Sequence, residues 1–240
     1  MNRHTITLGT TSSLAVNTSL IPKIPYDPMK DFVMVNGLFK VPQIIAGNAT
    51  VAYRSLADMV NAAKKEPGKL SWGYPGIGTT PHLSGELFKQ RAAIDIVDVI
   101  YKGSGQMVTD LLANQIPLAV DSIVSAIPQI ASGRIKAFAV TTTERVPQLP
   151  NVPTVAESGY PGFESVAWGG LMVPNGTPSI VVEKISTDVR KVLSEREMQK
   201  RIIDRGAIPD SRGTQEWSEF VRAEMAKWGE LVKKANIKLQ

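Results

Sequence analysis

Hydrophobic positions along the chain follow two periods, one typical of strands and one typical of helices. Short apolar runs that are rich in β-branched residues and end in Gly, Pro, Ser or Thr predict strands. These predicted strands cover residues 5–11, 32–39, 42–47, 69–74, 94–101, 116–122, 135–142 and 166–174. Apolar residues at intervals of three and four predict helices. The predicted helices cover residues 55–68, 81–92, 106–115, 123–133, 178–193, 195–205 and 214–235.

The last predicted helix carries a stripe of large residues along one face. The stripe is apolar apart from one glutamate and consists of Trp217, Phe220, Val221, Glu224, Trp228, Leu231 and Val232. Bulky apolar residues at this spacing usually face a core. We therefore expect core packing here and no ligand surface.

Strands and helices alternate between residues 94 and 142, which predicts a β-α-β-α-β unit. The run "IDIVDVIY" (94–101) is so rich in Ile and Val that it predicts a buried parallel strand. The pattern as a whole predicts an α/β protein with a parallel sheet wrapped by helices. Ligands of such proteins bind beyond the carboxyl ends of the strands, so the segments that follow those ends are the candidates for a site.

The stretch "WGYPGIGTTPHLSGELF" (72–88) places a Gly-rich loop directly before a helix. Thr79 or Thr80 occupies the expected N-cap position, Pro81 suits the first turn, and Gly78 allows a sharp backbone turn. Free N–H groups and the helix dipole attract an anion to such an N-terminus. The same residues are also typical of a capped turn that binds nothing, and the sequence leaves both interpretations open.

A second loop, "YKGSGQMVTDLL" (101–112), repeats this arrangement, with Ser104 as the candidate cap between Gly103 and Gly105. The strand end "TLGTTSSLA" (7–15) adds further hydroxyl groups. Parallel strands bring such ends to one edge of a sheet. We therefore expect a ligand that carries more than one negative group.

Two acids and two histidines are candidates for other chemistry. Asp121 ends a predicted strand, where N-capping of the next helix and ligand contact fit its position equally well. His82 lies in the first turn of its helix, where it can donate to a ligand or pack behind one. Asp110 is expected to face solvent or a neighbouring strand, and His4 suggests no role. P-loop, G-x-S-x-G and H-E-x-x-H motifs are absent, which argues against a nucleotide site and against an enzyme.

Composition narrows the function classes further. The 240-residue chain carries 27 basic and 22 acidic side chains, and the resulting net charge of +5 is spread along the chain. A nucleic-acid surface needs a focused basic stripe, so we expect no nucleic-acid partner. The chain has no cysteine, which excludes disulfides and thiol catalysis. No segment approaches the roughly 20 apolar residues of a membrane span, and the first residues do not show a secretion signal.

Several motifs together resemble the Bug family of extracytoplasmic solute-binding proteins, the receptor subunits of tripartite tricarboxylate transporters. They follow one another in the order expected for that family and span nearly the whole chain. The matching segments are "LGTTSSLAVNTSL", "IPYDPMKDF", "GIGTTPHLSGELFK", "VIYKGSGQMVTDLLANQI", "AVTTTERVPQLPNVPTVAESGYPGFE", "WGGLMVPNGTP" and "FVRAEMAKWGELVKKANI". Agreement in so many separate segments makes the resemblance specific.

The resemblance implies a two-lobed Venus-flytrap fold, the type II fold of periplasmic binding proteins, with the ligand between the lobes. Residues 1–101 and 170–240 would form lobe I, and residues 102–169 would form lobe II. The hinge would pass near Val99–Lys102 and return near 167–171. The implied ligand is a small carboxylate: a dicarboxylic or tricarboxylic acid, an acidic amino acid or an aromatic acid.

The resemblance also implies which residues hold the carboxylates, through backbone and hydroxyl donors. From lobe I the expected ligand contacts are Thr10, Thr11, Ser12, Gly78, Thr79 and Thr80, with His82 as a further candidate. From lobe II the expected ligand contacts are Lys102, Gly103, Ser104, Gly105, Asp121 and Ser122.

Members of this family carry a secretion signal and a strand–helix–strand ahead of the position where this chain begins. By resemblance we expect a periplasmic protein that lacks the first strand–helix–strand of lobe I. The strand 5–11 would then form a sheet edge. We expect a monomer that can self-associate through that edge.

The leading hypothesis is a non-enzymatic receptor that closes over a small carboxylate and delivers it to the membrane subunits of a tripartite tricarboxylate transporter. It requires no cofactor and no metal. The alternative is a ligand-free sensor or interaction protein derived from such a receptor. An α/β enzyme that uses Asp121 or His82 is a third hypothesis, weakened by the lack of a partner carboxylate or metal cluster. The sequence does not identify the acid.

Overall fold

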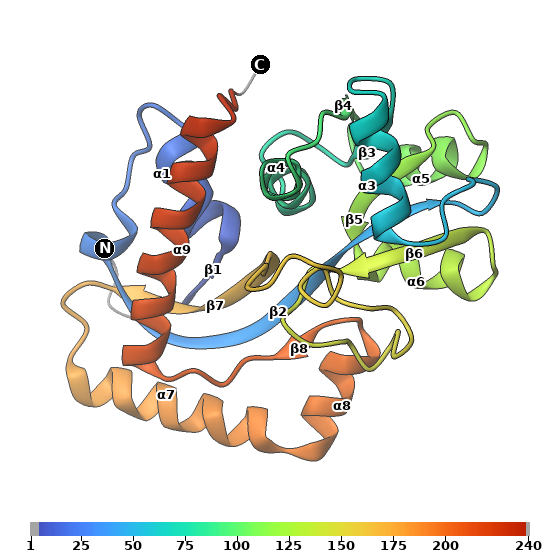
Figure 1. Ribbon diagram of the computed structural model, residues 1–240. Coiled ribbons are helices and arrows are strands. Elements are labelled where there is room, and N and C mark those ends of the chain that lie inside the picture. Colours follow the sequence, from blue (N-terminus) through green and yellow to red (C-terminus); the bar gives the residue numbers. More distant parts are fainter. Residues whose placement is uncertain (1–4, 239–240) are drawn as a thin grey trace. The chain divides into compact units, whose positions relative to one another are not determined.

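The computed structural model describes residues 5–238 and divides the chain into two compact units. Unit 1 consists of Met1–Val41 and Ala167–Gln240, and unit 2 consists of Pro42–Val166. Figure 1 labels the elements of both units. His4 lies outside the described residues. Within residues 5–238, no helix has the length and apolarity that a membrane span requires.

The sheet of unit 2 has the strand order β6-β2-β5-β3-β4. β2 (Phe32–Asn48) pairs antiparallel with β5 (Leu118–Ser122) and with β6 (Ile135–Val140) through its second half. β3 (Ser71–Tyr74) lies parallel to β5 and to β4 (Val97–Ile100). Four strands of this unit therefore run in one direction, and β2 runs against them.

Helices cover both faces of this sheet. They are α3 (Leu56–Lys65), α4 (Thr80–Ala92), α5 (Ser104–Leu112) and α6 (Ile123–Ala131). α3 and α4 contribute to one apolar cluster with the buried rings of Trp72 and Tyr74. Gly73, the residue between these two rings, points to the opposite face, where an added Cβ would meet Met107 of α5. Successive residues of β3 point to opposite faces of the sheet, so α3 and α4 cover one face and α5 covers the other.

The sheet of unit 1 is antiparallel wherever its strands pair. β1 (Thr7–Thr10) pairs with β7 (Val166–Pro174), β7 neighbours the first half of β2, and β8 (Ile208–Pro209) pairs with β2. β1 is the last strand of this order among the described residues, and the side chains of Leu8 in β1 and of Ile6 just before it are 49% and 53% exposed.

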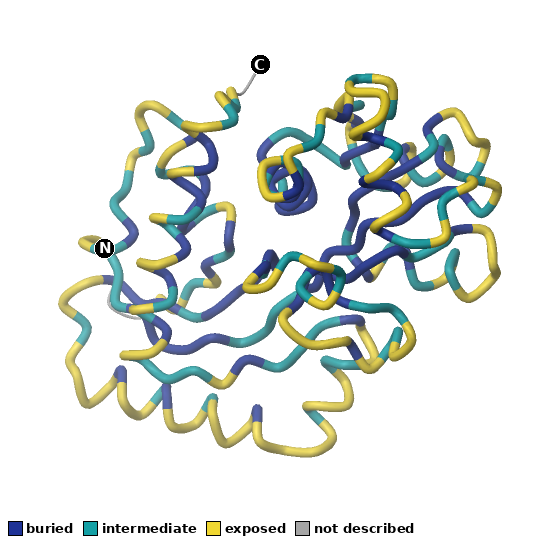
Figure 2. Tube along the Cα trace, viewed as in Figure 1, coloured by how far each residue is buried: buried dark blue, intermediate teal, exposed yellow. Residues whose placement is uncertain are grey.

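Two helical layers also enclose the sheet of unit 1. The chain passes from β1 through a π-helical turn, η1 (Thr11–Val16), into α1 (Asn17–Leu20), and α2 (Pro28–Asp31) precedes β2. The helices after β7 are α7 (Ser179–Ser194), α8 (Arg196–Asp204) and α9 (Thr214–Lys234). α9 packs on η1 and α1, whereas α7 packs on Val35 and Val173 of the sheet. In Figure 2 the outer turns of α7 and α8 are exposed, and the strands behind them are largely buried.

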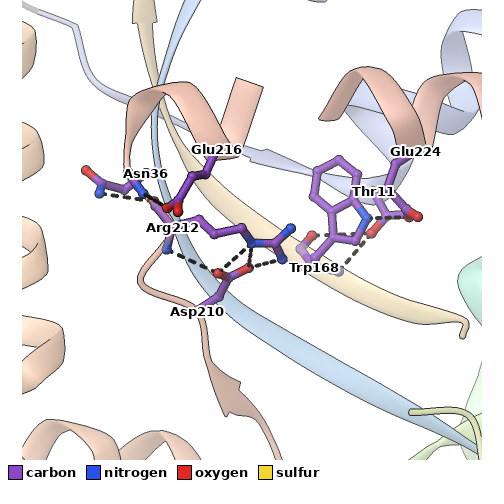
Figure 3. A network of polar contacts seen from close by, with 8 residues as sticks. Thr11, Asn36, Trp168, Asp210, Arg212, Glu216 and Glu224 are labelled. Carbon is purple, nitrogen blue, oxygen red and sulfur yellow. Dashed lines mark hydrogen bonds and ion pairs between the residues drawn. The ribbon is translucent and has the colours of Figure 1, made fainter. Parts of the chain in front are cut away.

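The stripe predicted on residues 214–235 lies in the core of unit 1, as expected. Trp217, Val221 and Trp228 are completely buried. The carboxylate of Glu224, the one polar member, accepts hydrogen bonds from the indole N–H groups of Trp168 at 2.7 Å and Trp228 at 2.8 Å. Figure 3 shows this contact from Trp168 to α9.

Several predictions about local structure differ from the observed strands. The predicted strands 32–39 and 42–47 form one continuous strand, β2. The segment 94–101 contains only a short strand, β4, which lies at the end of the sheet and leaves Val97 48% and Ile100 40% exposed. Its β-branched residues satisfy strand propensity and do not mark burial. The sheet of unit 2 is mixed rather than parallel, because β2 runs against its neighbours.

The two units also differ from the expected lobes. The prediction grouped 1–101 with 170–240, but residues 42–101 pack within unit 2. The reason is the hydrogen bonding of the sheet, because β2 pairs with β5 and β6 after Pro42, and β3 pairs with β5. The second crossing, at Val166 and Ala167, lies close to the predicted return. The expected placement of residues 78–80 and 102–105 in different lobes is therefore not what the structure shows.

Candidate functional site

The carboxyl ends of β3, β4 and β5 meet at one edge of the unit 2 sheet, because these strands run parallel. α4, α5 and α6 are the next elements in the chain after β3, β4 and β5, so each helix begins near this edge. Three helix N-termini are thus brought together, and each contributes N–H groups without an intrahelical partner. This edge contains all the predicted site residues of unit 2.

The loop before α4 forms the first of these N-termini. Gly78 has a φ angle of 69°, in the left-handed region that favours glycine. The Thr79 hydroxyl donates to the Gly76 carbonyl at 2.7 Å, and the Gly78 N–H donates to His82 Nδ1 at 3.3 Å. Thr79 is the N-cap residue by backbone conformation, but its side chain makes no capping hydrogen bond. The first turn of α4, which starts at Thr80, therefore lacks a side-chain cap.

The loop before α5 forms the second N-terminus, and it also lacks a side-chain cap. The N-cap is Gly103, with a φ angle of 147°, and not Ser104 as predicted. The Ser104 hydroxyl instead donates to Asp121 at 2.9 Å. A Cβ atom added at Gly103 or Gly105 would meet no atom within 4 Å, so the backbone here can be approached closely. Lys102 is exposed beside this loop.

Asp121 ties the ends of α5 and α6 together. Its carboxylate is 5% exposed and accepts hydrogen bonds from the Ser104 hydroxyl, the Ser122 N–H at 2.8 Å and the Ser125 hydroxyl at 2.5 Å. Burial raises the pKa of the Asp121 carboxyl above its ordinary value, against these hydrogen bonds, which lower it. Ser122, not Asp121, is the N-cap of α6 and accepts the Val124 N–H at 3.2 Å. α6 is therefore the capped member of the three helices.

A cluster of charged and titratable side chains follows the first loop, with His82 and Glu86 buried and Asp98 exposed. His82, Glu86 and Asp98 each offer one ligand-type atom, and these atoms lie within 4.8 Å of one another. The Lys89 ammonium lies 2.5 Å from Glu86 and 2.8 Å from both oxygens of Asp98, so a lysine supplies the positive charge that this set would otherwise draw from a metal ion. Burial raises the pKa of Glu86 to about 7 and lowers that of His82.

Sequence reasoning considered His82 alone and missed the rest of this cluster. A signal was present, because His82, Glu86 and Lys89 follow one another at intervals of four and three residues. That spacing places them on one face of α4. The fourth member, Asp98, comes from β4, and only the pairing of β4 with β3 brings it there.

Two of the three predicted contacts from unit 1, Thr10 and Thr11, have structural partners of their own. Thr10 caps η1 in a reciprocal pair with Ser13. The Thr11 hydroxyl accepts the Trp168 N–H at 2.8 Å and donates to the Trp168 carbonyl at 3.4 Å (Figure 3). Ser12 is exposed, and its hydroxyl makes no hydrogen bond with other described residues. Of the three, Ser12 alone offers a hydroxyl that is not already used within unit 1.

A second set of polar contacts in unit 1, also drawn in Figure 3, joins the segment before α9 to β2. The guanidinium of Arg212 pairs with the carboxylate of Asp210, with Nε at 2.9 Å from Oδ1, and lies 3.5 Å from the centre of the Phe220 ring. The Arg212 carbonyl accepts the Gly37 N–H at 3.0 Å and the Asn36 side-chain N–H at 3.3 Å. These charges serve the packing of unit 1, and sequence reasoning had not singled them out.

Comparison with known proteins identifies the family. The model of the tripartite tricarboxylate transporter family receptor, TctC, matches residues 2–237. The chain belongs to this receptor family. Among its relatives, BugT of Bordetella pertussis is 30% identical over 238 residues, which cover 99% of this chain and 73% of BugT.

Two solved structures are similar to this receptor in both sequence and fold. An R. palustris protein solved with adipate is 34% identical, with a TM-score of 0.83 over 96% of this chain and 77% of that chain. MatC from Rhodopseudomonas palustris, with bound malate, is 29% identical, with a TM-score of 0.76 over 95% of this chain and 79% of that chain. The α/β fold of periplasmic binding proteins, expected from the sequence motifs, is confirmed.

The TctC family assignment also decides the general class of function. The family and the similar structures are solute-binding proteins, so this receptor is a solute-binding protein and the expectation that it is not an enzyme is confirmed. The hypothesis of an enzyme that uses Asp121 or His82 is therefore set aside. Two helix N-termini of unit 2, those of α4 and α5, lack side-chain caps and follow neighbouring parallel strands, and such N-termini attract anions.

Proposed function

We propose that this protein is an extracytoplasmic receptor for a small dicarboxylate, held at the carboxyl edge of the unit 2 sheet. The observation that carries the proposal is the pair of helices, α4 and α5, that begin side by side without side-chain caps. Their free N–H groups face the edge where an anion gains from both helix dipoles. In α3 and α6 of the same unit, a serine side chain already occupies one of these N–H groups.

The energetics require several donors acting together. A charge at a helix N-terminus gains about 0.3–1 kcal/mol, and up to about 2 kcal/mol when partly buried. Micromolar affinity corresponds to about 8 kcal/mol. Each hydrogen bond to a charged group adds about 1.5–3 kcal/mol. Two N-termini and three or four N–H or hydroxyl donors therefore reach this range, and one N-terminus alone does not.

The donors that the proposal assigns to the ligand come mainly from backbone. At the first loop they are the N–H groups of the first turn of α4 with the hydroxyl of Thr80, and at the second loop those of Gly103, Ser104 and Gly105. Lys102 adds a flexible positive charge. The Gly78 N–H is not assigned to the ligand, because His82 accepts it. Asp121 and Ser122 position the loops.

The similar proteins solved with adipate and with malate support a dicarboxylate for this chain as well. By the same family membership we propose a periplasmic location and delivery of the solute to the membrane subunits of a tripartite tricarboxylate transporter. The alternative, a ligand-free sensor or interaction protein, predicts no response to any acid.

Isothermal titration calorimetry tests the proposal. The protein is titrated with adipate, with malate and with adipamide, which has the length of adipate without its charges. We expect one of the acids, or a close homologue, to bind and the diamide not to bind. A flat response across a panel of dicarboxylates would refute the proposal and favour the interaction protein.

Gly105→Val locates the site. Its new side chain would extend into open space at the α5 N-terminus, so the fold should be retained while the ligand is obstructed. Thr109→Val, one turn further along α5, is the matched control. We expect affinity to fall at least about tenfold, or 1.4 kcal/mol, in Gly105→Val and to change little in the control. Equal affinity in both variants would remove the α5 N-terminus from the site.

A further inference from the structure

The loop before α4 is held from behind by a buried imidazole. His82 is 6% exposed, and its Nδ1 accepts the N–H of Gly78, four residues earlier. A nitrogen that accepts a hydrogen bond carries no proton, so this contact selects the neutral tautomer with its proton on Nε2. The imidazole thus joins the first turn of α4 to the left-handed glycine of the loop.

The surroundings of His82 keep its ring fixed and balance the charges near it. The ring of Tyr74 on β3 meets it edge-on, with centroids 5.0 Å apart. Asp98 from β4 favours a proton on the imidazole, and Lys89 from α4 itself opposes one. Glu86, also on α4, is paired with Lys89 at 2.5 Å. Burial is the largest effect on the pKa of His82 and lowers it, which favours the neutral ring.

We propose that His82 is a positioning residue for ligand binding: its neutral imidazole anchors Gly78 and so holds the N-terminus of α4 in the orientation that receives a carboxylate. This inference rests on the proposed function, because it concerns the α4 N-terminus as a ligand donor. It differs from direct contact, since His82 acts through the Gly78 backbone and touches no ligand.

A dependence on pH follows from the geometry. Protonation of Nδ1 would place two hydrogen-bond donors, Nδ1–H and the Gly78 N–H, against each other. The anchor would then be lost and the loop would move from its binding conformation. Ligand affinity should therefore be constant at neutral pH and fall in acid, in addition to any loss from protonation of the ligand itself.

Two substitutions separate the anchor from general packing. In His82→Asn the side-chain Oδ1 stands where Nδ1 stood, so it can accept the Gly78 N–H, and it does not titrate. In His82→Leu the size is similar and the acceptor is gone. Both lose the ring contact with Tyr74 and are expected to lose comparable thermal stability. At neutral pH we expect the Asn variant to retain affinity for the dicarboxylate within about threefold, and the Leu variant to lose at least about tenfold.

The pH profile gives the second measurement. Between about pH 8 and about pH 5.5, the wild-type protein should lose more affinity than the Asn variant, whose acceptor does not titrate. Parallel profiles in the two proteins would overturn the proposal. Equal affinities of the Leu and Asn variants at neutral pH would overturn it as well.

A third measurement needs no variant and no ligand. Long-range ¹H–¹⁵N correlation spectra of the wild-type protein report which imidazole nitrogen of His82 carries the proton. We expect the proton on Nε2, and a proton on Nδ1 would refute the anchor even if both variants failed to fold. If the wild-type protein binds no dicarboxylate at all, the proposed function fails, and this spectrum still decides whether His82 anchors Gly78.

Discussion

Substitution of Asp121 by alanine should destabilise unit 2 more than any other single change near the candidate site. Its carboxylate accepts three hydrogen bonds, from the Ser104 hydroxyl, the Ser122 N–H and the Ser125 hydroxyl, at 2.9, 2.8 and 2.5 Å. The Ser125 hydroxyl also donates to the Ser122 carbonyl at 2.9 Å, so it keeps a partner. The Ser122 N–H is fixed by the backbone and cannot rotate toward a new acceptor.

The magnitude follows from these three contacts. A hydrogen bond to a charged group contributes about 1.5–3 kcal/mol, and a buried donor left without a partner costs about 1–3 kcal/mol. Removal of the buried charge returns part of this loss, because burial itself disfavours the ionised carboxyl. We expect a net loss of about 2–4 kcal/mol. For a chain of this length, about 2–4 °C per kcal/mol converts this to a fall in Tm of roughly 4–16 °C.

Thermal unfolding followed by circular dichroism measures this loss, with Asp110→Ala as the control. Asp110 accepts one hydrogen bond, from the Tyr101 hydroxyl at 2.9 Å, and lies in the same unit. Asp110→Ala removes one hydrogen bond to a partly exposed carboxylate, so we expect a loss of about 1.5 kcal/mol, the lower end for a hydrogen bond to a charged group. If Asp121→Ala melts no lower than Asp110→Ala, then Asp121 does not hold α5 and α6 together. Asp121→Asn, which keeps an acceptor oxygen, should fall between the two.

Three further predictions follow from other parts of the structure. The pKa of Glu86 is raised to about 7, above its unfolded value. Its stabilising contribution is therefore complete below the unfolded pKa and is lost as the pH rises through about 7. Glu86→Gln should flatten the dependence of Tm on pH between 5 and 8, and an unchanged slope would contradict this. Glu224→Leu should leave two buried indole N–H groups without an acceptor, at a cost of about 1–3 kcal/mol each. Glu224→Gln retains an oxygen that can accept from both indoles. Equal denaturant midpoints for the two variants would show that the indoles do not need this acceptor. Leu8→Lys should reduce concentration-dependent self-association in sedimentation velocity, because Leu8 is half exposed on the edge strand β1; a wild-type protein that stays monomeric at every concentration would end that argument.

Regular periodicity made the C-terminal helices easy to predict. The stripe from Trp217 to Val232 repeats at helical spacing, and the structure buries it as predicted. The predicted helix 55–68 also begins where expected, because Ser55 is the N-cap of α3 and its hydroxyl accepts the Asp58 N–H. The helical period and the N-cap depend on residues that lie close together in the chain, so local sequence patterns are sufficient to predict them.

Features that depend on distant partners were not predictable in this way. Ser104 has the residue type of an N-cap, but the buried carboxylate of Asp121 draws its hydroxyl away from the helix backbone. The richness of 94–101 in Ile and Val indicated burial, but within residues 5–238 β4 has only β3 as a neighbouring strand. The Lys89–Asp98 contact requires the pairing of β4 with β3. All three features depend on how the strands of the unit 2 sheet pair, which local residue patterns do not determine.

Continuity of β2 has a consequence for how the chain can be taken apart. The residues of β2 that pair with β8 end at Lys40, and those that pair with β5 begin at Gln43. Pro42 lies between them and has no N–H group to contribute to either ladder. The segment 42–166 therefore carries every strand partner of unit 2 in one uninterrupted piece. New chain ends introduced at Pro42 would fall between the two hydrogen-bonded ladders of β2. This proline is therefore the place to open the chain for circular permutation or for production of unit 2 by itself.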